Sequence, residues 1–157
     1  MARILIVDDE DELRSLLCEA VSGFGHEVFS ASDGVEGLRL YKQQEVDLVI
    51  TDLKMPRMDG LGLLKEIKAI RHDAVVLMIT GYPTVDSAVQ AIKLGAYDYI
   101  TKPFKFEEIE VVIQRAVDKK KLLEQLGLFR GLFWLAVFSI PFWIVLGIIW
   151  FSYASSN

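Results

Sequence analysis

The sequence predicts an α/β fold, in which a doubly wound parallel sheet of five strands alternates with five helices. Short apolar runs rich in β-branched residues recur along residues 1–124. They are too short for helices but typical of buried parallel strands. Segments with helical periodicity separate the runs. Residues 131–153 differ from both patterns, because this long uncharged stretch predicts one added C-terminal transmembrane α-helix.

Start and stop signals bound each predicted element. The first helix carries an apolar stripe and is stopped at Gly23, the fourth helix is stopped at Gly95, and Glu107 and Glu108 suit the N-terminus of the fifth. The predicted strands cover residues 4–7, 27–31, 48–52, 74–80 and 98–101. The predicted helices cover residues 10–22, 35–43, 61–69, 85–94 and a segment that begins near residue 106.

Polar residues stand at the ends of four of the predicted strands. Asp8 and Asp9 follow the first, Asp52 ends the third, Thr80 ends the fourth and Lys102 follows the fifth. In an open α/β sheet, ligands bind beyond the carboxyl ends of the strands. The sequence therefore predicts that these five residues form one site.

The chemistry of the five residues predicts a metal and a phosphoryl group. Three converging carboxylates would repel one another without a hard cation, and Mg²⁺ prefers carboxylate oxygens and retained waters. Lys102 and Thr80 supply a positive charge and a hydroxyl donor that can hold phosphoryl oxygens. One carboxylate is then free to attack phosphorus. Asp52, which precedes a turn-forming stretch, is the predicted nucleophile.

The segments around these residues carry a family resemblance. They read ILIVDDE (4–10), TDLKMP (51–56), MDG (58–60), TGYP (80–83) and TKPF (101–104). Through them, residues 1–124 resemble the receiver domain of two-component response regulators. Residues 91–99 are similar to receivers of the nitrogen-regulatory (NtrC) subfamily. The resemblance implies a flavodoxin-like sheet with strand order 2-1-3-4-5.

The resemblance also implies a role for each residue of the site. Asp52 would accept a phosphoryl group from the histidine of a sensor kinase or from a phosphotransfer protein. Asp9, Asp52 and the backbone carbonyl of Lys54 would ligate Mg²⁺ directly, and Asp8 would help through water. The chain would be a phosphoacceptor rather than an enzyme, with at most slow self-phosphorylation from small donors and slow self-dephosphorylation.

The same resemblance implies a switch. Thr80 would move toward the phosphoryl group, Tyr99 would follow, and the surface of the fourth helix, fifth strand and fifth helix would change its binding preference. The Lys102–Pro103 peptide bond would be cis. The sequence shows no output domain of the ATPase or DNA-binding kind, so the output is expected to be a partner, self-association or phosphate relay.

Each strand-end residue also has an ordinary structural interpretation. Asp8 and Asp9 are residue types that cap helices, and Asp52 precedes a turn. Thr80 before a glycine and Lys102 before a proline are common at strand ends. Caps and turns do not require suitable chemistry at four strand ends together, so the conjunction favours the site.

Two further functions are open at this point. One is a Mg²⁺-dependent phosphohydrolase with an aspartate nucleophile, of the kind seen in haloacid-dehalogenase-like enzymes. Those enzymes carry a second aspartate two residues after the nucleophile, where this chain has Lys54. The other is a small membrane assembly protein that a receiver regulates.

Composition separates the two parts of the chain. All 22 acidic residues and all but one of the 17 basic residues precede Gly127. The acidic balance argues against a nucleic-acid surface, which needs clustered Lys and Arg. The single cysteine, Cys18, cannot form an internal disulfide and is expected to pack in the core. His26 and His72 lie in expected turns and do not suggest a metal site.

The tail predicts how the protein meets a membrane. We expect a juxtamembrane linker at 125–130, a transmembrane helix at 131–153 and a short tail at 154–157. Lys119–Lys121 and Arg130 precede the span and nothing basic follows it. The positive-inside rule then predicts a single-pass protein of the bacterial inner membrane with a cytoplasmic receiver. A run such as Lys119–Lys121 is usually a solvated helix face, but beside a membrane segment it could also contact anionic lipid. An apolar stripe continuing through residues 109–126 suggests a homodimer.

Overall fold

The computed structural model describes residues 1–120 and 122. Its strands are β1 (Arg3–Val7), β2 (Glu27–Ala31), β3 (Leu48–Asp52), β4 (Val75–Thr80) and β5 (Asp98–Thr101). Its labelled helices are α1 (Asp11–Gly23), α2 (Gly34–Gln43), α3 (Gly60–Ile70) and α4 (Val85–Lys93). A further helix covers residues 106–120. Each predicted boundary agrees with the structure to within one residue.

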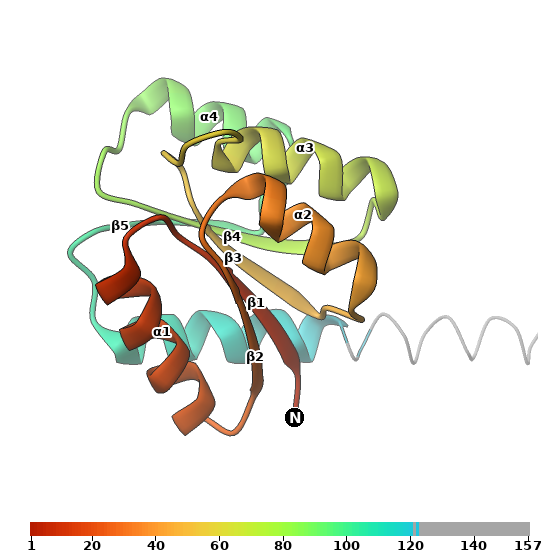
Figure 1. Cartoon of the computed structure of the whole chain (residues 1–157), viewed down its shortest axis with the longest axis vertical. Coiled ribbons are helices and arrows are strands. Elements are labelled where there is room, and N and C mark those ends of the chain that lie inside the picture. Colours follow the sequence, from red (N-terminus) through yellow and green to blue (C-terminus); the bar gives the residue numbers. More distant parts are fainter. Residues whose placement is uncertain (121, 123–157) are drawn as a thin grey trace, which may run out of the picture. The chain divides into compact units, whose positions relative to one another are not determined.

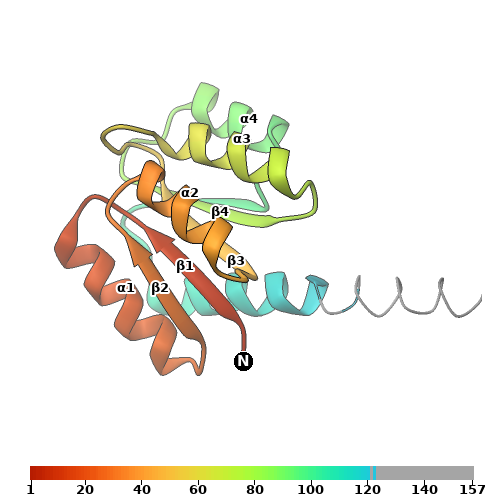
Figure 2. The same cartoon turned by 45° about the vertical axis from the view of Figure 1, so that its right-hand side comes forward.

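The five strands form one parallel sheet in the order β2-β1-β3-β4-β5, which confirms the predicted flavodoxin-like topology. Helices α2, α3 and α4 cover one face, and α1 and the 106–120 helix cover the other (Figures 1 and 2). Parallel strands require such crossover helices, so the sheet is buried on both faces. Its central strand β3 is buried at every position, whereas edge strand β5 is partly exposed.

Strand alternation builds one core on each face of the sheet. In β1, Leu5 and Val7 pack toward α2 and α3, while Ile4 and Ile6 pack toward α1 and the 106–120 helix. These four side chains have no solvent exposure. Burying each contributes roughly 1.5–3 kcal/mol, so the sheet is a firm base for the polar groups at its edge. Cys18 packs against the second core, as predicted, and is partly buried.

Local signals explain where the helices begin and end. Thr84 and Ser87 form a reciprocal capping box at the start of α4. The turn after α1 needs a left-handed residue, and Gly25 supplies it with φ +84°.

No helix within residues 1–120 and 122 is both long and apolar enough to cross a membrane. The predicted span at 131–153 lies outside these residues, as do the predicted linker at 125–130 and the tail at 154–157.

Candidate functional site

Four strands deliver the predicted polar residues to the carboxyl edge of the sheet. Asp8 follows β1, Asp52 ends β3, Thr80 ends β4 and Lys102 follows β5. Pairing of Thr80 with Thr101 brings Lys102 level with the β4 end. The parallel register therefore gathers residues that are far apart in the sequence.

Lys102 lies between two carboxylates. Its Nζ donates a hydrogen bond to Asp8 Oδ2 at 3.0 Å and forms an ion pair with Asp52 Oδ1 at 3.5 Å. Burial acts to lower the pKa of Lys102, but the hydrogen bond and charge of Asp8, together with the charge of Asp52, outweigh it and raise the pKa. The ammonium is therefore held charged where phosphoryl oxygens would gather.

Asp52 is buried yet incompletely bonded. The residue is 7% exposed, and its Oδ2 accepts a hydrogen bond from the Lys54 backbone N–H at 3.2 Å. Its Oδ1 is buried without a hydrogen-bond partner. Burial raises the pKa of Asp52 and the nearby Asp8 charge adds to this rise, while Lys102 opposes it. An under-satisfied buried carboxylate with a shifted pKa is typical of a functional site.

Of the predicted switch residues, Thr80 contacts the loop between β4 and α4, and Tyr99 contacts the first turn of α4. Thr80 is fully buried, and its hydroxyl oxygen accepts a hydrogen bond from the Tyr82 N–H at 3.1 Å. Tyr99 is half-buried, and its hydroxyl lies 2.9 Å from Ser87 Oγ. Ser87 also belongs to the α4 capping box with Thr84. Movement of Tyr99 would therefore break a bond to the helix terminus.

Comparison with known proteins identifies the family. The family model for the response regulator receiver domain matches residues 4–114. The chain belongs to the response regulator receiver family.

Named relatives and solved structures agree with this assignment. The receiver is 38% identical over 124 residues to the regulatory protein AtoC of Escherichia coli K12, which covers 79% of this chain and 27% of the relative. It thus spans about a quarter of that relative's length. A receiver domain from Clostridium thermocellum superposes with a TM-score of 0.75 at 38% identity, covering 78% of this chain and 99% of that one. NtrX from Brucella abortus gives the same TM-score at 39% identity, over 80% and 29% of the chains.

The predicted metal ligands of the receiver have suitable chemistry. A cleft of about 480 Å³ is lined by Asp9, Glu10, Asp52, Lys54, Gly81, Tyr82 and Lys102. Two carboxylates and a backbone carbonyl would suit Mg²⁺, which keeps several waters. Asp52 Oδ2 accepts one hydrogen bond, from the Lys54 N–H, and keeps a lone pair that such a cation would use. Within residues 1–120 and 122, no three His, Cys, Asp or Glu side chains gather into a metal site of their own.

The structure also tests whether Asp8 or Asp9 is only a helix cap. Glu10, rather than Asp8 or Asp9, is the N-cap of α1, and its side chain makes no cap bond. Asp8 does accept the Glu10 backbone N–H through Oδ1 at 2.9 Å, but its other oxygen binds Lys102. The Lys102–Pro103 peptide bond is cis, as the resemblance implies.

Sequence reasoning missed one contact at the mouth of the cleft. The Lys54 ammonium lies 4.2 Å from the ring centroid of Tyr82, which is 65% exposed. The prediction for Lys54 concerned its backbone carbonyl alone. The sequence position of the two residues could have predicted this contact. Lys54 lies two residues after Asp52, and Tyr82 lies two residues after Thr80.

Proposed function

We propose that Asp52 is the phosphoacceptor of a receiver that takes its phosphoryl group from a sensor histidine kinase or a phosphotransfer protein. Receivers of this family interact with such donors. The observation that carries the proposal is the buried Asp52 Oδ1, which has no hydrogen bond and lies 3.5 Å from the Lys102 ammonium. That oxygen is available as a nucleophile, and the neighbouring cation can stabilise charge on the incoming group.

Mg²⁺ is the proposed cofactor, held by Asp9, Asp52 and the Lys54 carbonyl, with Asp8 acting through water. When bound, the cation would offset the negative charge of the carboxylates and of the phosphoryl donor. Asp8 orients Lys102 through its 3.0 Å hydrogen bond. Asp52 attacks phosphorus as the P–N bond of the donor phosphohistidine breaks and the donor histidine leaves, and Lys102 and Thr80 bind the phosphoryl oxygens now carried on Asp52.

The proposed output is a change in the surface of α4, β5 and the 106–120 helix. Thr80 moves toward the phosphoryl group, and Tyr99 leaves Ser87 to follow it. The exposed face of α4 supports a binding role, because Val85, Val89 and Ile92 are 81%, 44% and 58% exposed. Partner binding, homodimerisation or phosphate relay could each use this surface.

Mass measurement tests the phosphoacceptor. The full chain in mild detergent is incubated with acetyl phosphate and Mg²⁺. We expect wild type to gain one phosphoryl group and to lose this gain with chelator, while Asp52→Asn gains none. Equal labelling of Asp52→Asn would refute the assignment.

A second variant tests the switch. Thr80→Ala should accept phosphate at Asp52 but leave the hydrogen exchange of α4 amides unchanged on phosphorylation. If α4 in this variant responds as in wild type, Thr80 is not the coupling residue.

We also propose that residues 131–153 anchor the receiver to the bacterial inner membrane in one pass, with the receiver in the cytoplasm. The support is the uncharged stretch and the basic residues Lys119–Lys121 and Arg130 on its N-terminal side. These lysines would contact anionic lipid. The protein should remain in the membrane pellet after alkaline carbonate, and protease added to spheroplasts should spare the receiver. Carbonate release would refute the anchor, and digestion from outside would refute the orientation.

A further inference from the structure

The loop that follows the phosphoacceptor is tied to a neighbouring helix. It joins β3 to α3 and lies beside the first turn of α2 (Figure 1). The Gly34 N–H donates a hydrogen bond to the Met58 carbonyl at 3.2 Å, and the Gly60 N–H donates to the Leu53 carbonyl at 2.9 Å. A Cβ at Gly34 would lie 2.6 Å from the Met58 oxygen. The loop and α2 are therefore in backbone contact.

One buried carboxylate joins the same two segments. Asp33 is 1% exposed, and its Oδ1 caps α2 by accepting the N–H groups of Val35 at 2.8 Å and Glu36 at 3.0 Å. Its Oδ2 pairs with the guanidinium of Arg57 in the loop. One oxygen of Asp33 therefore caps α2, and the other binds the loop. A buried carboxylate oxygen without a partner is costly, so the pair favours one loop position.

The backbone of Arg57 indicates that this attachment is specific. Arg57 has φ +65°, and it is the one non-glycine residue with positive φ among residues 1–120 and 122. A bulky side chain in this region carries a backbone penalty that glycine would avoid. The arginine side chain, 60% exposed, reaches back from this conformation to Asp33.

We propose that the Asp33–Arg57 ion pair positions the phosphoacceptor loop, keeping Lys54 beside Asp52 in the geometry that the metal and phosphoryl group require. Lys54 already contacts Asp52, because its N–H donates to Asp52 Oδ2 at 3.2 Å. Asp33 and Arg57 are positioning residues, since neither lines the cleft. The proposal rests on the proposed function for its metal-binding part only.

The test combines charge removal with rescue. Arg57→Gln removes the cation, Asp33→Asn keeps a capping oxygen but removes the anion, and Arg57→Lys restores the charge. The double variant Asp33→Asn/Arg57→Gln measures coupling. Arg39→Gln is the matched control, because Arg39 is 56% exposed and forms a long 3.9 Å pair with Glu36 on α2.

Hydrogen exchange of the Gly34 and Gly60 amides measures directly how firmly the loop is held. Labelling the full chain in detergent with ¹⁵N-glycine gives one signal for each of the 11 glycines. We expect Arg57→Gln and Asp33→Asn each to speed Gly34 and Gly60 exchange by about tenfold, the double variant no further, and Arg57→Lys to restore it. Gly95, whose N–H donates to Ile92 at the end of α4, should stay unchanged. Unchanged Gly34 exchange, or equal acceleration at Gly95, would overturn the proposal.

Metal affinity gives a second reading without a phosphodonor. Mn²⁺, followed by loss of its free paramagnetic resonance signal, should bind several-fold more weakly to Arg57→Gln, and Arg57→Lys should bind as wild type. Wild-type Mn²⁺ affinity in Arg57→Gln would overturn the positioning role. If wild type binds no Mn²⁺ and takes no phosphoryl group, the proposed function fails, while glycine exchange still decides whether the ion pair holds the loop.

Discussion

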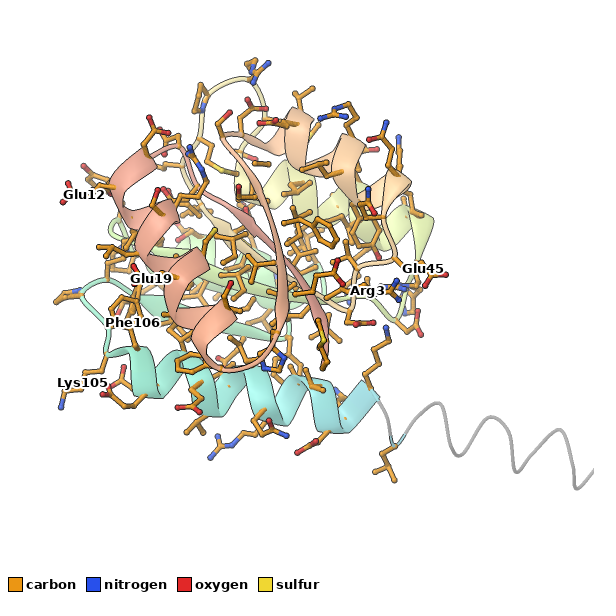
Figure 3. The ribbon with its side chains drawn as sticks, turned by 60° about the horizontal axis from the view of Figure 1, so that its bottom comes forward. Arg3, Glu12, Glu19, Glu45, Lys105 and Phe106 are labelled. Carbon is orange, nitrogen blue, oxygen red and sulfur yellow. The ribbon has the colours of Figure 1, made fainter. Side chains whose placement is uncertain are left out.

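The two ends of the parallel sheet carry similar charges in different environments. At the carboxyl end, the side chains of Lys102, Asp8 and Asp52 are 20%, 3% and 9% exposed. At the amino end, Arg3 pairs with Glu45 at 2.6 Å, and the two side chains are 37% and 83% exposed (Figure 3). Water solvates the Arg3–Glu45 pair, so this ion pair contributes little to the free energy of unfolding. The side chains of Lys102, Asp8 and Asp52 have lost most of their contact with water, and hydrogen bonds within the protein replace it only in part. This cost of desolvation distinguishes the carboxyl end of the sheet, where the candidate site lies.

Packing differs between the two ends in the same way. A Cβ at Gly60, beside the site, would lie 2.1 Å from the Asp52 carbonyl oxygen. A Cβ at Gly23, at the far end of α1, would meet nothing within 4 Å. The structure near Asp52 is therefore less tolerant of an added side chain than the structure near Gly23.

The largest effect is expected from Lys102→Ala. This variant should still bind Mg²⁺ but lose the phosphorylation-dependent change in hydrogen exchange of α4 and β5 completely, because it lacks the cation that we propose binds the phosphoryl oxygens. The control is Lys105→Ala, since Lys105 is exposed at the start of the 106–120 helix (Figure 3). A wild-type change in hydrogen exchange in Lys102→Ala would show that the response to phosphorylation does not depend on the charge of Lys102.

Gly60→Ala should have the largest effect on stability. We expect a loss of about 3 kcal/mol in the free energy of unfolding, because the contact is with backbone that cannot move aside. Gly23→Ala should instead be neutral or stabilise by up to about 1 kcal/mol, since alanine restricts the unfolded chain. Denaturant titration measures both. Similar losses of unfolding free energy in Gly60→Ala and Gly23→Ala would show that packing does not differ between the two ends of the sheet.

Asp52→Asn should stabilise the metal-free protein. Because the folded pKa of Asp52 is raised, the stability due to its protonated form is present below the ordinary carboxyl pKa and is lost as pH rises through the folded value. At neutral pH the wild type carries the cost of a buried charge, whereas the asparagine variant does not. Thermal midpoints with chelator should therefore differ most near neutral pH and converge below about pH 4. A variant less stable at pH 7 would contradict this account.

The smallest effect is expected from Glu45→Gln. Its ion pair with Arg3 is solvent-exposed, so the free energy of unfolding should change by less than about 0.5 kcal/mol. Phosphorylation of Asp52 should proceed at the wild-type rate. A larger change would mean that the amino end of the sheet contributes more than its exposure suggests.

Sequence by itself determined the order and limits of the elements. The β-branched runs and the stops at Gly23 and Gly95 are local, so each boundary followed from nearby residues. It also placed Asp52 and Lys102 at one edge, because parallel strands send all their carboxyl ends to the same side.

Tertiary structure alone decided which side chains touch. Lys102 binds Asp8, Ser87 contacts Tyr99, and Asp33 pairs with Arg57, and each contact joins residues from different elements or loops. Such contacts depend on how helices pack on the sheet and how loops bend, as at Arg57 with its positive φ. Periodicity along the chain carries no information about those distances, because it describes which face a residue occupies rather than which residue it meets.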